Sequence, residues 1–224
     1  MNRKKAICLL SGGLDSAACL YEARKQGYDV IALTFDYGQR HHRELKSAHA
    51  LAKAVAVKHY DVQFSMPWRG SALTDKKVLF HDAKDVAHIS KRIPNTYVPA
   101  RNSVFLSLAA SCAEAENAGA IFIGANAVDY SGYPDCRPAY LKTFEALIRK
   151  GTKAGAEGRT IKIFAPLLRL SKKQIVLKAL ELGVPIKKTW SCYRGGKKPC
   201  GKCDSCLLRA KGFLDAGKKD PLVG

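Results

Sequence analysis

The first residues that could carry chemistry are the run Ser11-Gly12-Gly13-Leu14-Asp15-Ser16. This run follows a short apolar segment, residues 6–10, and leads into residues 15–26, whose composition is typical of a helix. Two glycines let the backbone approach an anion closely, and the two serines add hydroxyl groups. The free N–H groups and the positive dipole at the start of a helix favour phosphate at such a turn. The run therefore predicts a phosphate-binding loop.

Two well-known phosphate loops do not fit this run. No Lys follows the glycines, which disfavours a P-loop kinase or GTPase. The spacing G-x-G-x-x-G is also missing, which disfavours a dinucleotide-dependent dehydrogenase. The alternative is an ordinary glycine turn with a helix cap. A bare Gly-Gly pair would favour that reading, but the complete pattern directly after a first strand argues against it.

A second chemical signal lies near the end of the chain, where four of the eight cysteines fall within fifteen residues. A C-x2-C step brings two thiolates within reach of one ion at about 2.3 Å. Four sulfurs complete a tetrahedron and leave no position for a catalytic water, so this pattern predicts structural zinc. An iron–sulfur cluster is the alternative, since C-x2-C-x2-C also binds one. The predicted ligands are Cys192, Cys200, Cys203 and Cys206.

The segments that must position these residues alternate between strand and helix. Such an order predicts a parallel sheet covered by helices on both faces, an α/β Rossmann-like fold. Residues 65–93 break the alternation and predict a long irregular insertion. We expect an α/β domain over residues 1–186, followed by a small zinc-binding segment and a packed helix over residues 187–224. The predicted strands are residues 6–10, 30–35, 59–64, 120–124 and 161–164, and the predicted helices are residues 15–26, 42–57, 101–117, 138–150 and 171–182, the last capped by Ser171.

Composition and charge narrow the function classes. The chain has 224 residues and a formal net charge of +19, and no apolar run reaches the ~18 residues that a membrane helix needs. The apolar run near the basic N-terminus is too short for a signal peptide, so we expect a cytoplasmic protein. Residues 151–224 hold 17 Lys and Arg against 5 Asp and Glu. Charge alone leaves three interpretations open: a nucleic-acid partner, an anionic small-molecule substrate, or a basic and soluble surface without a specific partner.

Longer segments resemble a known family. The run from Ser11 to Ser16 resembles the pyrophosphate loop of the N-type ATP pyrophosphatases, which adenylate carbonyl oxygens on an adenine nucleotide alpha hydrolase-like fold. Three further segments and the cysteine tail are similar to the 7-cyano-7-deazaguanine (preQ0) synthase family. The resemblance covers nearly the whole chain. The segments are TFDYGQRH at 34–41, YVPARNS at 97–103, GANAVDYSGYPDCRP at 124–138, and residues 191–206.

This resemblance implies a carbon–nitrogen ligase of queuosine biosynthesis. Members convert 7-carboxy-7-deazaguanine and ammonia to 7-cyano-7-deazaguanine (preQ0) with ATP and Mg²⁺, through an adenylated carboxylate and an amide. They hold one structural zinc on four cysteines, are commonly homodimers and need no nucleic acid. The residues left over form no glutaminase domain, so ammonia is expected to enter free or from a partner.

The resemblance also implies which residues form the site. Asp15 is expected to help position Mg²⁺, or otherwise to cap its helix, and Arg101 to contact phosphate or the substrate carboxylate. Cys136 is not expected to be a nucleophile, because adenylation needs none. The ATP-binding set is Leu10, Ser11, Gly12, Gly13, Leu14, Asp15, Ser16 and Phe35; the catalytic set is Ser11, Asp15, Ser16 and Arg101; the substrate-binding set is Asp129, Tyr130, Tyr133, Asp135 and Arg137.

Two other functions stay open from the sequence. A tRNA-thiolating enzyme of the same superfamily would use the same loop and would bind tRNA with a steep salt dependence. A zinc-ribbon binding module without catalysis would bind a partner without consuming ATP. The segment at 124–138 argues against the first alternative, and the phosphate loop argues against the second.

Overall fold

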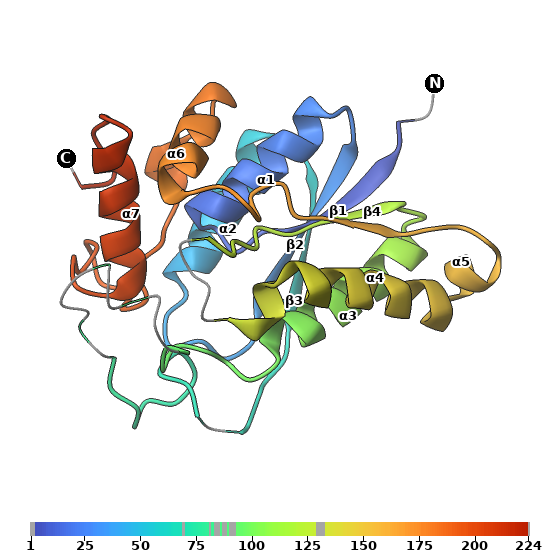
Figure 1. Cartoon of the computed structure of the whole chain (residues 1–224), viewed down its shortest axis with the longest axis horizontal. Helices are drawn as coiled ribbons and strands as arrows, with labels where there is room; N and C mark the ends of the chain where they lie inside the picture. The colour runs from blue at the N-terminus through green and yellow to red at the C-terminus, as the bar shows by residue number, and fades with distance from the viewer. Residues whose placement is uncertain are drawn as a thin grey trace.

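The computed structural model describes residues 3–68, 70–80, 82, 86, 89, 93–128 and 133–223. Its centre is a five-stranded, all-parallel sheet in the order β3-β2-β1-β4-β5 (Figure 1). This arrangement confirms the α/β fold and the five strands predicted from the sequence. The strands are β1 (Lys5–Leu9), β2 (Asp29–Asp36), β3 (Lys58–Gln63), β4 (Ala120–Phe122) and β5 (Lys162–Phe164).

Helices cover both faces of the sheet, because its strands carry apolar side chains on both of these faces. In β1, Ile7 and Leu9 pack with α3 and α4, whereas Ala6 and Cys8 pack with α1, α6 and α7. Figure 1 shows these two helical layers on opposite sides of the strands. The helices are α1 (Leu14–Lys25), α2 (Arg43–Ala54), α3 (Arg101–Ala115), α4 (Pro138–Gly151), α5 (Lys153–Ala156), α6 (Lys172–Glu181) and α7 (Asp204–Asp215), with short 3-10 turns at Pro134–Cys136 and Ile186–Lys188.

Local signals explain where these helices begin and end. Ser171 caps α6 as predicted: its hydroxyl accepts from the Gln174 N–H at 3.3 Å, and the Gln174 side chain accepts from the Ser171 N–H at 2.8 Å. Helix α3 ends two residues earlier than predicted, because Asn117 has left-handed backbone (φ 54°). The strand predicted over residues 120–124 ends at Phe122.

The C-terminal segment is tied to the α/β domain by backbone and side-chain contacts. The Trp190 N–H donates to the carbonyl of Gly12 at 2.8 Å, and α7 packs on α6. Within the segment, Arg209 forms a buried bidentate ion pair with Asp220 (2.6 and 2.9 Å). The start of the segment, at Trp190, therefore lies against the predicted phosphate loop, and its helix lies against α6.

Two further expectations bear on the remaining chain. Residues 65–93 are described only in part, and their described portion contains no strand. Within the described ranges, no helix has the length and apolar character needed to cross a bilayer.

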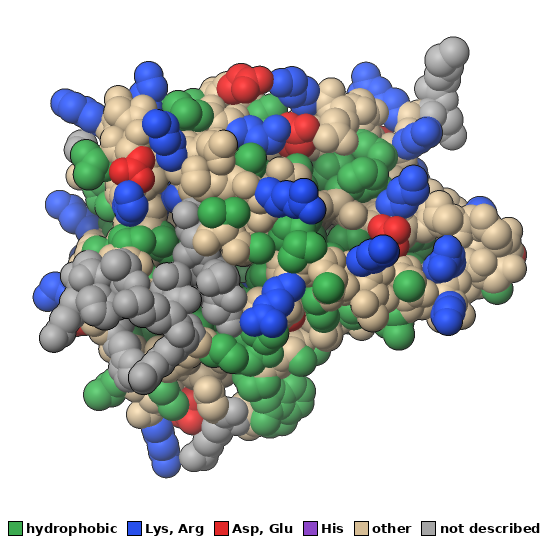
Figure 2. All heavy atoms as spheres, viewed as in Figure 1, with side chains coloured by type: hydrophobic (Ala, Val, Ile, Leu, Met, Phe, Trp, Pro, Cys, Tyr) green, Lys and Arg blue, Asp and Glu red, His purple; other side chains and the backbone are tan. Residues whose placement is uncertain are grey.

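Figure 2 shows Lys and Arg scattered over one face of the molecule and few acidic side chains among them.

Candidate active site

The phosphate loop joins β1 to α1 and is held by its own hydrogen bonds. The Ser11 N–H and hydroxyl both donate to Ser16 Oγ (3.2 and 3.1 Å), and the Ser16 hydroxyl lies 3.1 Å from the carbonyl of Gly13. Gly12 has a left-handed φ of 84°, and a Cβ at this position would lie 2.2 Å from the carbonyl oxygen of Glu44. Only glycine fits there, so the loop conformation depends on α2 as much as on its own sequence.

A second glycine brings β4 against the same loop. A Cβ on Gly124 would lie 3.1 Å from the Ser16 backbone nitrogen and 3.3 Å from its Cα. The segment after β4 therefore contacts the first turn of α1 directly. The loop thus lies at the carboxyl edge of the sheet, where parallel α/β sheets bind ligands.

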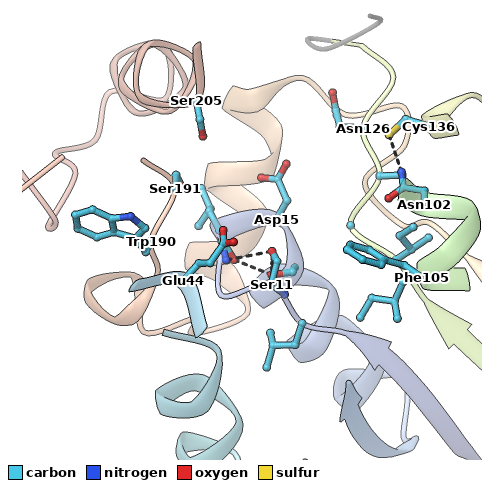
Figure 3. A pocket seen from close by; sticks show the side chains of 18 of the residues that line it. Ser11, Asp15, Glu44, Asn102, Phe105, Asn126, Cys136, Trp190, Ser191 and Ser205 are labelled. Carbon is cyan, nitrogen blue, oxygen red and sulfur yellow. Dashed lines mark hydrogen bonds between the residues drawn. The ribbon is translucent and has the colours of Figure 1, made fainter. Parts of the chain in front are cut away.

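A cavity of about 290 Å³ opens beside this loop (Figure 3). Its volume is close to the lower end of the range for small-molecule sites. Its walls come from the ends of β1, β2 and β4, the first turns of α2, α3 and α6, and the C-terminal segment. Nine of the predicted site residues line it: Leu10, Ser11, Gly13, Leu14, Asp15, Ser16, Phe35, Arg101 and Tyr133.

The other predicted site residues have different positions. Asp135 is buried behind the cavity wall, where its Oδ2 accepts from the Asn102 N–H at 3.0 Å at the start of α3. Arg137 is exposed and, like Asp135, is not among the cavity residues. Asp129 and Tyr130 lie outside the described residues.

Arg101 is positioned by the aromatic residues around it. Its Nη1 donates to the Tyr37 hydroxyl at 3.2 Å, and its guanidinium lies 5.7 Å from the Phe105 ring centre. Burial raises the pKa of Tyr37 to about 12, so the phenol stays protonated at neutral pH. Ala100 precedes Arg101 in left-handed conformation, and its N–H donates to Tyr97 Oη at 3.0 Å. The arginine is therefore fixed at the cavity wall rather than free on the surface.

Lys172 is a site residue that sequence reasoning missed. Its Nζ donates to both carboxylate oxygens of Asp15 (3.0 and 2.8 Å) and it lines the cavity. A signal existed in the sequence: Lys172 follows the capping residue Ser171, and a cation at the first position of a helix opposes the helix dipole. A lysine at the start of a helix therefore suggests that its charge interacts with a group outside that helix, here the Asp15 carboxylate.

Glu44 is a second cavity residue that was not predicted. The sequence around it gave no signal, because acidic residues are common in the first turn of a helix. Its side chain lines the cavity, and burial raises its pKa to about 7. The C-terminal segment adds a further wall that the sequence did not predict. That wall contains Trp190, Ser191, Tyr193, Ser205, Leu208 and Arg209.

Cys136 lines the cavity as a thiol. Burial raises its pKa to about 11, and the Asn102 side-chain amide lies 3.3 Å from its sulfur. A thiol that stays protonated at neutral pH is a poor nucleophile. This environment agrees with the expectation that the reaction needs no covalent intermediate on the enzyme.

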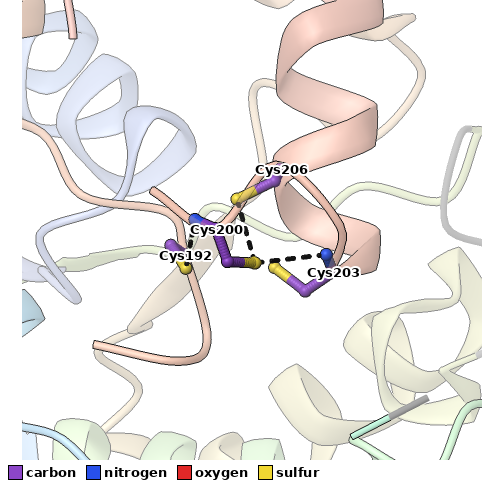
Figure 4. Close-up of side chains that lie close together, drawn as sticks. All are labelled: Cys192, Cys200, Cys203 and Cys206. Atoms are coloured by element: carbon purple, nitrogen blue, oxygen red, sulfur yellow. Dashed lines mark hydrogen bonds between the residues drawn. The ribbon is translucent and has the colours of Figure 1, made fainter. Parts of the chain in front are cut away.

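The four C-terminal cysteines form one cluster (Figure 4). Their sulfur atoms all lie within 4.8 Å of one another, and those of Cys200 and Cys206 are 3.9 Å apart. Tetrahedral zinc with Zn–S bonds of about 2.3 Å requires sulfur separations of about 3.8 Å. Backbone N–H groups donate to the sulfurs of Cys192 and Cys200 at 3.3–3.4 Å. The donor set and its dimensions fit a divalent metal ion.

The thiols of this cluster interact closely with one another. Hydrogen bonds from the Cys203 and Cys206 thiols lower the pKa of Cys192, and the same hydrogen bonding raises the pKa of Cys206. A divalent cation would let all four ionise together. The ligands Cys203 and Cys206 alternate along α7 with the cavity residues Ser205 and Arg209. The metal site and one cavity wall are thus two faces of the same helical turn.

A second group of possible metal ligands is held by hydrogen bonds within the protein. His49, His59 and Asp61 lie close enough to share an ion. However, the Thr34 hydroxyl donates to the carbonyl of Leu10 at 2.7 Å, so it must accept from His59 Nε2 at 2.8 Å. That nitrogen then carries a proton and has no lone pair for a metal.

The family described as "Queuosine biosynthesis protein QueC" matches residues 5–217. The chain belongs to this family. The resemblance found in the sequence is therefore confirmed, and so are the fold class and the four-cysteine cluster that go with it.

Relatives in the QueC family match over nearly their full lengths. The "7-cyano-7-deazaguanine synthase" of Trichodesmium erythraeum is 51% identical over 221 residues, which is 98% of this chain and 100% of the relative. The protein of the same name from Thermoplasma acidophilum is 52% identical over 99% of this chain and 92% of its own. Among solved structures, the NMN synthetase of Francisella tularensis shares the fold at 18% identity, with a TM-score of 0.51 over 97% of this chain and 79% of that one.

Proposed function

We propose that this chain is an ATP-dependent 7-cyano-7-deazaguanine synthase that makes the nitrile from 7-carboxy-7-deazaguanine and ammonia. The observation that carries the proposal is the identity of 51–52% with proteins of that name over nearly whole chains. The cavity supports it, because a phosphate loop, a fixed arginine and aromatic side chains meet in one small volume.

In this proposal the loop holds the ATP phosphates. The backbone and hydroxyl groups from Ser11 to Ser16 would bind phosphate oxygens, and Lys172 would add a positive charge as the pyrophosphate leaves. Asp15 would hold Mg²⁺ together with the phosphates, and the ion would supply charge neutralisation there. Phe35, at the end of β2, lies against Phe105 with ring centres 4.2 Å apart and offers an apolar surface to the adenine.

The deazaguanine would occupy the side of the cavity near Arg101 and Tyr133. Arg101 would hold the carboxylate in line with the α-phosphate of ATP, and the Tyr133 ring, 5.7 Å from that of Tyr97, would contact the flat heterocycle. Asp135 would act through Asn102, whose backbone N–H it accepts. For Arg137 we propose no direct contact with the substrate.

The proposed chemistry has two activations at the same carbon. The carboxylate attacks the α-phosphate of ATP and gives an acyl adenylate and pyrophosphate. Ammonia displaces AMP to give the amide and a proton. The amide oxygen then attacks the α-phosphate of a second ATP and releases a second pyrophosphate, and loss of AMP and of the remaining N–H protons forms the nitrile. Each step needs charge neutralisation and alignment rather than an enzyme nucleophile.

Zinc would have a structural role in this scheme. Four thiolates leave it no open position, so it supplies no Lewis-acid chemistry to the substrate. Bound to Cys203 and Cys206, it would fix the first turn of α7 and with it the cavity residues Ser205 and Arg209.

The test is direct. Purified protein incubated with 7-carboxy-7-deazaguanine, Mg-ATP and ammonium should yield the nitrile and AMP, identified by mass spectrometry. Thiolation of tRNA without nitrile formation would contradict the proposal and favour the tRNA-modifying alternative. We also propose a homodimer that needs no nucleic acid, on the family resemblance, and sedimentation in the presence and absence of tRNA would test both points.

A further inference from the structure

Glu44 is an acidic side chain of the cavity for which the proposed chemistry has no role so far. Two carboxylates line the cavity in the described part of the chain, Asp15 and Glu44. Asp15 is paired with Lys172 at 2.8 Å. No Lys, Arg or His nitrogen of the described residues lies within 4.0 Å of the Glu44 carboxylate. A half-buried carboxylate without a cationic partner is costly, so its presence indicates a ligand that carries positive charge.

The position of Glu44 places this carboxylate near the reacting groups. Its backbone carbonyl is the atom that a side chain at Gly12 would strike, so the first turn of α2 rests on the phosphate loop. Figure 3 shows the Glu44 side chain pointing into the cavity on the same side as Ser11 and Asp15. In the proposed function, the acyl adenylate that forms at the phosphate loop would therefore lie next to Glu44.

The carboxylate is also held in place. Gln39 hydrogen-bonds to it, and the Gln39 amide is itself fixed: its Oε1 accepts from the Tyr37 N–H at 2.8 Å and its Nε2 donates to the carbonyl of Phe35 at 3.2 Å. This chain of contacts starts at the end of β2, so Glu44 is oriented by the sheet and not by solvent.

The charges around Glu44 leave it able to exchange a proton. Burial raises its pKa to about 7, Arg101 opposes that rise, and Asp36 adds to it. Lys172 is neutralised by Asp15, and Arg209 by Asp220. Tyr37 stays protonated. At neutral pH the acid and its conjugate base are then both present, which is the condition for efficient proton transfer.

We propose that Glu44 forms an ammonium subsite, in which its carboxylate binds the ammonium ion and takes one proton from it beside the activated carbonyl. The inference rests on the proposed function, because it needs an acyl adenylate as acceptor. The C–N bond forms as ammonia attacks the acyl carbon, and the C–O bond to AMP breaks. The first proton goes to Glu44, and the second leaves the tetrahedral adduct for solvent.

The pH dependence of the isosteric variant Glu44→Gln tests this subsite. With wild type, kcat/KM for total ammonium should rise with pH and level off above the pKa of Glu44, because ammonium binds to the ionised carboxylate. With Glu44→Gln only free ammonia reacts, so kcat/KM should fall about 100-fold at neutral pH and rise tenfold per pH unit through the pKa of Glu44, levelling off only where the ammonium ion itself loses its proton. Equal profiles for the two proteins would overturn the inference.

Two further measurements separate the subsite from other roles of Glu44. Exchange of labelled pyrophosphate into ATP, with 7-carboxy-7-deazaguanine and no ammonium, reports adenylation alone and should be unchanged in Glu44→Gln. Hydroxylamine, which is uncharged at neutral pH, should form the hydroxamate at nearly the wild-type rate. Loss of exchange in the variant would assign Glu44 to Mg²⁺ or the heterocycle and overturn the inference.

A control and a reference complete the design. Glu157→Gln removes a surface carboxylate that is paired with Arg159, and all three readouts should match wild type. Glu44→Asp keeps the charge and should restore part of the ammonium plateau. If the wild-type protein shows no pyrophosphate exchange, the proposed adenylation itself is wrong. If the wild-type protein shows exchange but its pH profile equals that of Glu44→Gln, only the ammonium subsite is wrong, so the two failures are distinguishable.

Discussion

The phosphate loop and the cysteine cluster are both short glycine-containing segments in front of a helix, but they are stabilised in different ways. The loop is complete without a ligand, because the bonds between Ser11 and Ser16 and its contacts with α2 fix its backbone. The cluster has four crowded sulfurs, and hydrogen bonds between them stand where a metal would bind. The backbone of the loop is fixed by contacts within the chain, whereas the four sulfurs of the cluster form a donor set that could hold an ion.

This difference has a functional consequence, because α7 connects the two regions. Cys203 and Cys206 face the cluster, whereas Ser205, Leu208 and Arg209 face the cavity. A metal in the cluster would therefore support binding at the loop from a distance.

The largest effect is expected from Cys203→Ser. Loss of one thiolate should abolish metal retention and unfold the C-terminal segment, at a cost of several kcal/mol, since metal binding is coupled to folding. Zinc content by plasma mass spectrometry, Tm and nitrile formation should all fall. Cys112→Ser, which changes a half-buried cysteine of α3 outside the cluster, should keep its metal. A metal-free Cys203→Ser protein with wild-type Tm would show that the cluster does not depend on the ion.

Gly12→Ala should be the most damaging change in the loop. The added Cβ would strike the Glu44 carbonyl at 2.2 Å, so the loop or α2 must move, and a displacement of about 1 Å costs about 100-fold in turnover. Gly27→Ala is a matched control, because Gly27 has the same φ of 84° with nothing within 4 Å of a Cβ. It should lose about 1 kcal/mol of stability and no activity. Similar kinetics for both variants would contradict a preorganised loop.

Lys172→Met should have an intermediate effect. It removes the cation that Asp15 now contacts, and a charged hydrogen bond of this kind contributes about 1.5–3 kcal/mol. We expect KM for ATP to rise at least about tenfold in steady-state assays of AMP release, and Tm to fall because the ion pair with Asp15 is lost. Lys173→Met, at the exposed neighbouring position, should behave as wild type. An unchanged KM for ATP would mean that Lys172 serves only to hold α6 against α1.

The smallest effect is expected at Glu116, which belongs to neither region. Hydrogen bonds from Lys58 and Tyr60 (2.7 and 2.6 Å) lower its pKa to about 2. Because the folded pKa lies below the ordinary value of 4.5, its contribution to stability is present above that value and is lost as pH falls toward 2. Glu116→Gln should lower Tm by about 1–3 °C at neutral pH, and the difference should shrink in acid. A difference that stays constant with pH would contradict this account.

Much of the site was predictable because its residues are neighbours in sequence. The predicted phosphate loop and the four clustered cysteines are each local in sequence, so residue types and spacing over a few positions were enough to make both predictions. The substrate segment was harder. The contact of Asp135 with substrate stays a prediction; in the structure its carboxylate accepts the Asn102 N–H at the start of α3, a partner 33 residues away. From the sequence alone, an aspartate that accepts a hydrogen bond from a helix N-terminus cannot be distinguished from an aspartate that binds a ligand.

The sequence by itself determined the alternation of strands and helices, the phosphate loop and the donor set for a metal, because each follows from hydrophobic period or spacing over a few residues. Only the tertiary structure decided that Lys172 reaches Asp15 across 157 positions, that Glu44 lines the same cavity with no ion pair among the described residues, and that α7 forms part of the cavity wall. These contacts depend on how α2, α6 and α7 pack on the sheet, and packing is set by buried surfaces that no short pattern in the sequence encodes.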